Sequence, residues 1–162
     1  MARVYVGIGS NTERETRIRE AVHELRKRFG EVQISPVYDS EAVGFDGSNF
    51  LNLVAGFDTS LDAETVVSAF HLIEDALGRD RSQPKFSSRP IDLDILLYDD
   101  MILEVPGIRI PRPEILESAF VLKPLQDIAG HHLHPQTGQS YSSHWQSMAS
   151  TAPRLDVVVL NL

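Results

Sequence analysis

No cysteine occurs among the 162 residues of this chain. Disulfides, iron–sulfur clusters, thiolate zinc sites and cysteine nucleophiles are therefore excluded together. The sequence also lacks an apolar run long enough to cross a membrane, so we expect a soluble, cytoplasmic protein that does not bind membranes. It contains neither a P-loop motif nor the Gly-x-Ser-x-Gly elbow of serine hydrolases, so any nucleotide has to be bound without a P-loop.

Positive charge is scarce as well. The chain carries 15 Lys and Arg against 23 Asp and Glu, which gives a net charge of −8. A surface of this sign repels polyanions, so we expect no binding to nucleic acid. The exception is the segment 79–90, where Asp80 is the only acid among Arg79, Arg81, Lys85 and Arg89. A solvated, charged loop is the simplest interpretation of such a segment, and a phosphate-binding loop is the alternative.

The length and composition suit one domain. Apolar residues make up 42% of the sequence, which is enough for a single core in a chain of this size. We therefore expect one domain over residues 1–162 and a monomeric protein.

Hydrophobic periodicity predicts a β-α-β-β-α-β order. Strands are expected over residues 3–10, 32–38, 51–58 and 91–98, with helices over residues 12–30 and 60–78. This is the order of the α+β, ferredoxin-like fold, an antiparallel sheet with two helices on one face, although the order alone leaves other α+β folds open. The rest forms a C-terminal extension, with a strand over 101–105, an apolar stretch over 119–128, a short helix near Trp145 and a strand over 157–160.

Several local signals accompany these elements. Thr12 and Glu15 have capping-box spacing at the start of the first helix. Gly7 and Gly9 lack the third glycine of a dinucleotide fingerprint, so we interpret them as a tight turn from strand to helix. Pro36 is expected to break the second strand or to confine it to an edge.

Asp92 and Asp94 are the sharpest candidates for chemistry. Alternation along a strand sends Leu93 to the core and both carboxylates to the opposite face, with their Cα atoms about 7 Å apart. Carboxylates on a fixed strand suit Mg²⁺, which binds one or two of them and completes its shell with phosphates and waters. The alternative is that both acids simply face water. The basic segment just before them favours a centre for phosphoryl transfer.

Other candidates are weaker. Asn52 offers a donor and an acceptor to a heterocycle, and Phe50, Phe86 and Phe120 could stack on one, although each aromatic alone is more often a core residue. A cluster of three histidines, His131, His132 and His134, has only Asp127 as an acidic neighbour, so we do not favour a zinc site there.

A series of motifs resembles one family of enzymes. In order, they are Gly9-Ser10-Asn11, Phe50-Leu51-Asn52, Gly78-Arg79, Arg89-Pro90-Ile91-Asp92-Leu93-Asp94-Ile95, Ile110-Pro111-Arg112-Pro113 and Phe120-Val121-Leu122-x-Pro124-Leu125. Together they resemble the 6-hydroxymethyl-7,8-dihydropterin pyrophosphokinases of folate biosynthesis. The resemblance spans residues 3 to about 128 and implies transfer of pyrophosphate from ATP to the pterin alcohol, with release of AMP.

The resemblance also implies roles for individual residues. Asp92 and Asp94 would hold two Mg²⁺ ions on the ATP phosphates, and Arg79 and Arg89 would neutralise phosphate charge during catalysis. The remaining implied contacts fall into two groups. Those with ATP involve Glu74, Arg81, Ile95, Arg109 and Arg112, and those with the pterin involve Ser40, Val43, Phe50, Asn52, Phe86 and Phe120.

The chain departs from the family pattern at several positions. Arg112 stands where the family usually has histidine, and Ser118 stands where an arginine is common. Glu41 replaces a usual proline, and Phe86 lies near a usual tryptophan. Arg112 keeps a positive charge for phosphate but cannot exchange protons near neutral pH. These departures leave open an alternative, a module that binds a pterin or nucleotide without turnover.

Overall fold

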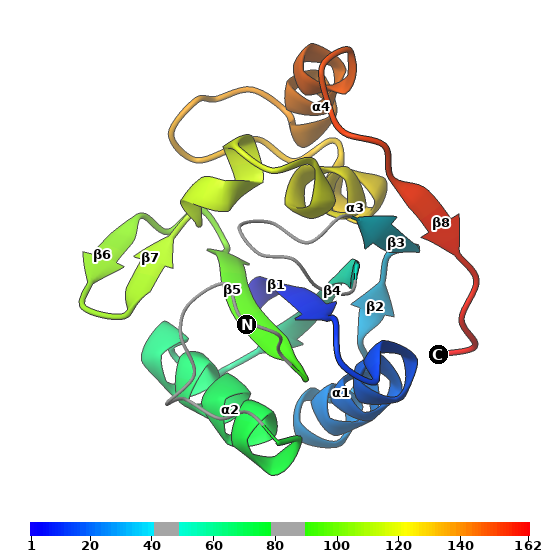
Figure 1. The fold of residues 1–162 in the computed structure, drawn as a ribbon. Coiled ribbons are helices and arrows are strands. Elements are labelled where there is room, and N and C mark those ends of the chain that lie inside the picture. The colour runs from blue at the N-terminus through cyan, green and yellow to red at the C-terminus, as the bar shows by residue number, and fades with distance from the viewer. Residues whose placement is uncertain (41–48, 79–89) are drawn as a thin grey trace.

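The computed structural model describes residues 1–40, 49–78 and 90–162. Most elements of the expected β-α-β-β-α-β core are present in the expected order, and the second strand is divided at Pro36 (Figure 1). The core comprises β1 (Ala2–Ser10), α1 (Arg14–Phe29), β2 (Gln33–Ile34), β3 (Val37–Ser40), β4 (Phe50–Thr59), α2 (Ala63–Ala76) and β5 (Asp92–Tyr98). The C-terminal extension comprises β6 (Leu103–Val105), β7 (Ile108–Ile110), the 3₁₀ helix η1 (Pro113–Leu116), α3 (Ala119–Ala129), α4 (Tyr141–Ala149) and β8 (Asp156–Val158).

The main sheet is antiparallel, with strands in the order β5-β1-β4-β3-β8, and β2 also pairs with β4. The first strand, β1, therefore lies between β4 and β5. This arrangement confirms the ferredoxin-like fold expected from the sequence. The extension adds β8 at one edge of the sheet and a separate hairpin of β6 and β7.

One face of the sheet packs against α1 and α2 (Figure 1). Val4, Val6 and Ile8 of β1 point to this face because alternate residues of a strand share a side. The helices bury apolar residues three or four positions apart, such as Ile18 and Leu25 in α1. These side chains form the larger core of the protein.

The opposite face is covered by the extension. Tyr5, Val54 and Leu96 of the sheet pack there against Leu122 of α3 and Tyr141 of α4. Because helices cover both faces, β4 is buried along nearly its whole length, and not on one face only as its sequence suggests. Among the described residues, no helix combines the length and the apolar character needed to cross a membrane.

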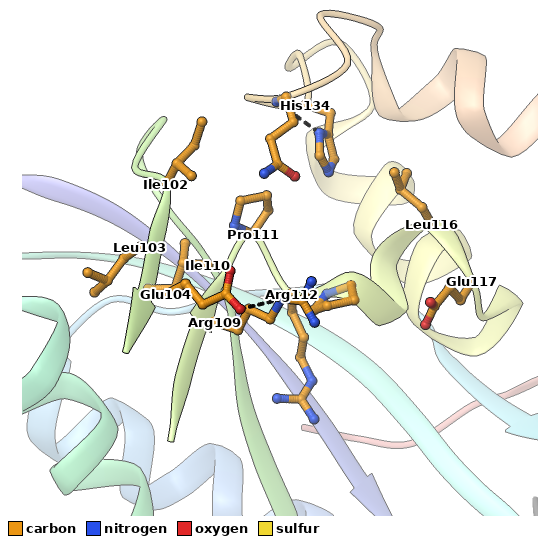
Figure 2. Close-up of a pocket in the computed structure, with 12 residues that line it drawn as sticks. Ile102, Leu103, Glu104, Arg109, Ile110, Pro111, Arg112, Leu116, Glu117 and His134 are labelled. Carbon is orange, nitrogen blue, oxygen red and sulfur yellow. Dashed lines mark hydrogen bonds and ion pairs between the residues drawn. The ribbon is translucent and has the colours of Figure 1, made fainter. Parts of the chain in front are cut away.

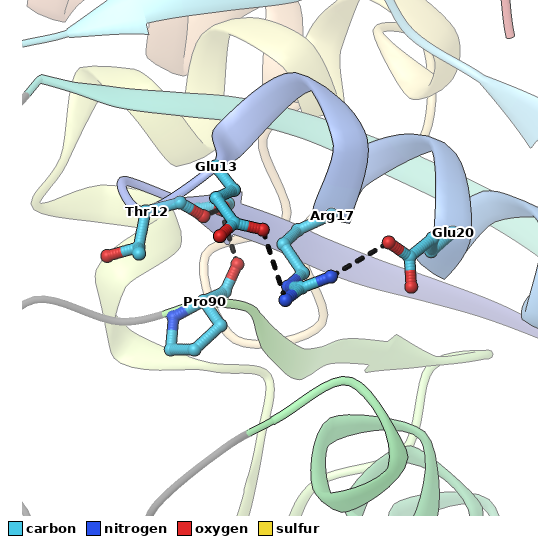
Figure 3. A network of polar contacts seen from close by, with 6 residues as sticks. Thr12, Glu13, Arg17, Glu20 and Pro90 are labelled. Carbon is cyan, nitrogen blue, oxygen red and sulfur yellow. Dashed lines mark hydrogen bonds and ion pairs between the residues drawn. The ribbon is translucent and has the colours of Figure 1, made fainter.

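The start of α1 differs from the expected capping box. The helix begins at Arg14, and Glu13 occupies the cap position in the left-handed conformation, with φ 48°, without a side-chain cap. Arg17 instead bonds back to Glu13 and forward to Glu20 (Figure 3). The Thr12 and Glu15 prediction is therefore wrong, since ion pairs along the first turns replace the reciprocal hydrogen bonds.

Two side-chain contacts, one from a hydroxyl and one from a carboxylate, fix the ends of elements in the core. The Ser10 hydroxyl bonds the carbonyl of Pro90, which ties the end of β1 to the residues that lead into β5 (Figure 3). At α2 the Asp62 carboxylate accepts from the Thr65 N–H at 2.8 Å, as expected for an N-cap. The first contact lies where β1 ends and β5 begins, whereas the second follows the end of β4, at the opposite end of the sheet.

Candidate active site

Polar side chains gather at one end of the sheet, on the face that α3 covers. Gly9 of β1 pairs with Asn52 of β4 on one side and with Asp92 of β5 on the other. Directly opposed residues in neighbouring strands point to the same face, and adjacent strands lie about 4.8 Å apart. The amide of Asn52 and the carboxylate of Asp92 therefore flank a position that has no side chain.

The two glycines of β1 lie within the strand. We expected Gly7 and Gly9 to form a tight turn, and this prediction is wrong, since β1 continues to Ser10 and neither glycine has a positive φ. A side chain at Gly9 would place its Cβ only 2.8 Å from Asn52 Oδ1. Gly9 is thus required by the close approach of Asn52 and keeps the space between Asn52 and Asp92 open.

Asp92 and Asp94 alternate with buried residues, as the sequence predicts. Leu93 and Ile95 are buried in the core beneath α1 and α2, whereas both aspartates are half-buried on the opposite face. The edge of β5 is fixed by Glu74 of α2, whose buried carboxylate accepts from the Leu93 N–H at 2.8 Å. An otherwise open strand edge is thereby held in place beside the two acids.

The pKa of Asp94 is raised from 3.8 to about 6. The largest cause is desolvation by the surrounding chain, the nearby Arg112 lowers it, and repulsion from Asp92, Glu74 and Glu114 raises it further. The side chain nevertheless keeps 44% of its surface exposed, so a cation or a phosphate can reach the carboxylate. A carboxylate pair with this mutual repulsion is stabilised by a bound cation.

Arg112 provides the nearest described positive charge. Its Nη2 lies 3.7 Å from Asp94 Oδ1, and its Nε contacts the carboxylate of Glu114. The backbone N–H of Arg112 donates to the Leu96 carbonyl at 3.0 Å, which fixes the residue against β5. Sequence reasoning selected Arg112 and missed Glu114. The only signal for Glu114 in the sequence was that it is an acid two residues after Arg112.

Asn52 is oriented by Ser40. Its Nδ2 donates to Ser40 Oγ at 2.9 Å, and only 9% of the Asn52 residue is exposed. Its Oδ1 is thereby directed towards Gly9. Phe50, two residues earlier on β4, shares this face and is half-buried, so an apolar ring lies beside the oriented amide.

The remaining candidates are dispersed. Phe120 is half-buried in α3, and Arg109 in β7 is 63% exposed, 3.9 Å from Glu104. The Ile95 side chain belongs to the core, which limits any nucleotide contact mainly to its backbone. Ser118 begins α3 without a side-chain cap. Arg79, Arg81, Arg89, Val43 and Phe86 lie outside the described residues, as does Glu41.

A cavity of about 260 Å³ lies beside the Pro111–Pro113 segment (Figure 2). Arg109, Arg112 and Leu116 line it together with His134 and residues of the β6–β7 hairpin. His134 is buried, and its Nδ1 accepts from the N–H groups of Gln136 and Thr137. In the described part of the chain no group of three or more His, Asp or Glu side chains could hold a metal ion.

Comparisons with known proteins identify the family of this chain. The family model for 7,8-dihydro-6-hydroxymethylpterin-pyrophosphokinase (HPPK) matches residues 5–130. The 2-amino-4-hydroxy-6-hydroxymethyldihydropteridine pyrophosphokinase of Aquifex aeolicus is 36% identical over 137 residues, which cover 83% of this chain and 85% of the relative. The enzyme of the same name from Pseudomonas aeruginosa is 37% identical, with 78% and 80% covered.

Longer proteins also contain a region similar to this chain. The folic acid synthesis protein fol1 of Pneumocystis carinii is 37% identical over 148 residues, and the chain spans only 20% of its length. A Plasmodium falciparum HPPK-DHPS crystal structure with pteroate matches with a TM-score of 0.75 at 13% identity, covering 92% of this chain and 42% of that one. This structural likeness supports the fold, and the matches over most of the chain establish the family. The chain belongs to the 7,8-dihydro-6-hydroxymethylpterin-pyrophosphokinase family.

Proposed function

We propose that the residues around Gly9 carry out the family reaction, transfer of pyrophosphate from ATP to the hydroxyl of 6-hydroxymethyl-7,8-dihydropterin with release of AMP. The chain is a pyrophosphokinase of folate biosynthesis, and therefore a diphosphotransferase with ATP as co-substrate. Beyond this activity, we propose roles for single residues and the presence of two metal ions. We also propose that the protein is a monomer with a single domain.

Asp92 and Asp94 fit a magnesium site. Both are half-buried on one face of β5, and the pKa of Asp94 is raised mainly by desolvation, with a further contribution from repulsion by Asp92. Mg²⁺ favours a small number of carboxylates and leaves the rest of its shell to phosphate and water. The two acids would hold two Mg²⁺ ions. Bound Mg²⁺ would neutralise phosphate charge and align the transferred group.

Arginines complete the binding of ATP. Arg112 lies within reach of Asp94, so a phosphate beside the carboxylates would also meet a guanidinium. Arg79, Arg81 and Arg89 are proposed to supply further positive charge, with Arg109 at the margin. Phosphoryl transfer depends mainly on alignment and charge neutralisation, so fixed cations can serve it without any proton transfer.

The pterin would lie beside Asn52. The side-chain amide of Asn52 is held by Ser40, so the amide presents one orientation to the edge of a heterocycle. Because Gly9 has no side chain, there is room for the heterocycle next to this amide. Phe50 and Phe120 are proposed to contact the ring, with Val43 and Phe86 as further contacts. Glu74 supports the site indirectly through Leu93, and Ile95 would contribute through its backbone.

The observation that carries this proposal is the row Asn52, Gly9, Asp92, which brings an oriented amide and a carboxylate to one face of the sheet. The test measures AMP and pterin diphosphate formed from ATP and the pterin alcohol. We expect Asp92→Ala or Asp94→Ala to lower turnover on the order of a hundredfold or more while the fold persists. The exposed Asp100, just beyond β5, provides the matched control, Asp100→Ala. A wild-type protein that binds both ligands and forms no AMP would favour the non-catalytic module.

A further inference from the structure

Arg112 lies between carboxylates from two different elements. Asp94 belongs to β5, and Glu114 belongs to the first turn of η1. The guanidinium touches Glu114 through Nε, whereas its Nη2 stays 3.7 Å from Asp94, beyond hydrogen-bonding distance. The three side chains are between 35% and 44% exposed, so all three are partly open to solvent and to ligands.

The backbone of Arg112 is fixed independently of these contacts. Its N–H donates to Leu96 at 3.0 Å, and its carbonyl accepts from the Ile115 N–H at 3.1 Å. The Glu114 carbonyl similarly accepts from Glu117 and Ser118 N–H groups. Changing the side chain of Glu114 therefore leaves the main-chain bonds of the segment in place and alters only where the guanidinium rests.

Two cations compete for Asp94 in the proposed site. A guanidinium that pairs fully with the carboxylate blocks oxygen atoms that Mg²⁺ needs, and the paired arginine is also lost to phosphate. Without Glu114, the acid nearest to Arg112 in the described structure would be Asp94, and Coulomb attraction would draw the two together.

We propose that Glu114 is a positioning residue that holds Arg112 beside Asp94 without full contact, so that Asp94 stays available to Mg²⁺ and Arg112 to the ATP phosphates. This inference rests on the proposed function, since it takes Asp94 as a metal ligand. It assigns to Glu114 a role in substrate binding that acts through Arg112.

A purely structural role for Glu114 makes a different prediction. An acid in the first turn of a helix can stabilise that helix through its N-terminal dipole. Its removal would then lower the free energy of unfolding and leave the affinity for metal unchanged. Direct measurement of metal binding to the free protein therefore separates the two roles.

The experiment compares Glu114→Ala and Glu114→Gln with the control Glu117→Ala. Glu117 is an exposed acid three residues further on, so its loss reproduces the change in net charge. Mg²⁺ binding to the free protein is measured by calorimetry, and the thermal transition of each variant checks its folding. We expect Glu114→Ala to raise the Kd for Mg²⁺ about two- to fivefold, a size suited to partly exposed charges, with a similar rise for a non-hydrolysable Mg·ATP analogue. Glutamine, which still accepts a hydrogen bond, should fall between alanine and the wild type.

Removal of Arg112 supplies the decisive comparison. Arg112→Ala should lower the Kd for Mg²⁺ because the competing cation is gone, while it raises the Kd for the ATP analogue. In that background Glu114→Ala should have no more effect than Glu117→Ala. The proposal is overturned if the full effect persists without Arg112, or if a folded Glu114→Ala protein matches Glu117→Ala. A protein that binds Mg²⁺ with this dependence and forms no AMP would overturn the proposed function alone.

Discussion

Replacing Gly9 by alanine tests the close approach at the centre of the site. The added Cβ would lie 2.8 Å from Asn52 Oδ1 and 3.8 Å from Phe50 Cδ1. The first distance is too short for carbon and oxygen, so Asn52 has to move by about half an ångström or β1 has to shift. Asn52 cannot move freely, because its Nδ2 is bonded to Ser40 at 2.9 Å and the residue is buried.

The expected cost follows from these contacts. Overpacking in a filled site costs about 1–3 kcal/mol, and losing the Asn52 hydrogen bond costs about 0.5–1.5 kcal/mol. We expect Gly9→Ala to lower the free energy of unfolding by about 1–3 kcal/mol. Displacement of the amide should also weaken pterin binding about tenfold, the equivalent of 1.4 kcal/mol.

The matched control is Gly7→Ala, on the same strand and the same face. Its Cβ would meet Leu96 Cδ2 at 3.5 Å, which is an ordinary contact. We expect its stability to stay within about 0.5 kcal/mol of the wild type and its pterin affinity to be unchanged. Urea unfolding and a pterin fluorescence titration measure both quantities. Equal results for the two variants would refute the argument that Asn52 requires glycine at position 9.

Three further predictions concern β5 and its surroundings. Because the folded pKa of Asp94 is about 6, against 3.8 ordinarily, its ionisation destabilises the metal-free fold as pH rises from about 4 to 6. Asp94→Asn should therefore raise the thermal transition at pH 7, a gain that shrinks as pH falls from about 6 to 4, and it should weaken the stabilisation by Mg²⁺. Leu93→Ala should lower the free energy of unfolding by about 2–5 kcal/mol in a urea titration, because the side chain is only 4% exposed. Arg112→Lys should recover part of the ATP affinity lost in Arg112→Ala in a nucleotide titration, since it restores charge without the planar fork; unchanged affinity in Arg112→Ala would remove Arg112 from the site.

Local patterns in the sequence predicted most of the fold. Alternation in residues 91–98 assigned Leu93 to the core and Asp92 and Asp94 to the other face, because a strand has a fixed period of two. Applied to the expected strand over residues 51–58, the same rule places Asn52 on the face opposite Leu51 and Leu53, but it does not predict what surrounds Asn52 there. The burial of that second face depends on α3 and α4, which lie far along the chain.

The errors arose where one pattern serves two structures. A Gly-x-Gly sequence suits a tight turn, and it equally suits a strand that a neighbouring side chain approaches closely, as Asn52 approaches Gly9. At the start of α1, the spacing of Thr12 and Glu15 satisfied the capping rule, yet Arg17 with Glu13 and Glu20 forms the contacts that occur. Both outcomes depend on contacts with side chains, Asn52 in one case and Arg17 in the other, that the turn and capping patterns do not take into account.

The contact of Arg112 with Glu114 shows the same limit at the proposed site. The sequence indicates that an arginine replaces the usual histidine, and charge alone predicts attraction to any nearby carboxylate. Which carboxylate it contacts depends on the path of the chain, since Arg112 N–H bonds Leu96 and directs the side chain between β5 and η1. A histidine side chain is too short to reach between Asp94 and Glu114. The position of the positive charge beside Asp94 therefore depends on both Arg112 and Glu114. An exchange to Arg112→His should accordingly make Glu114 dispensable for Mg²⁺ binding, and a persistent dependence on Glu114 in that background would contradict this coupling.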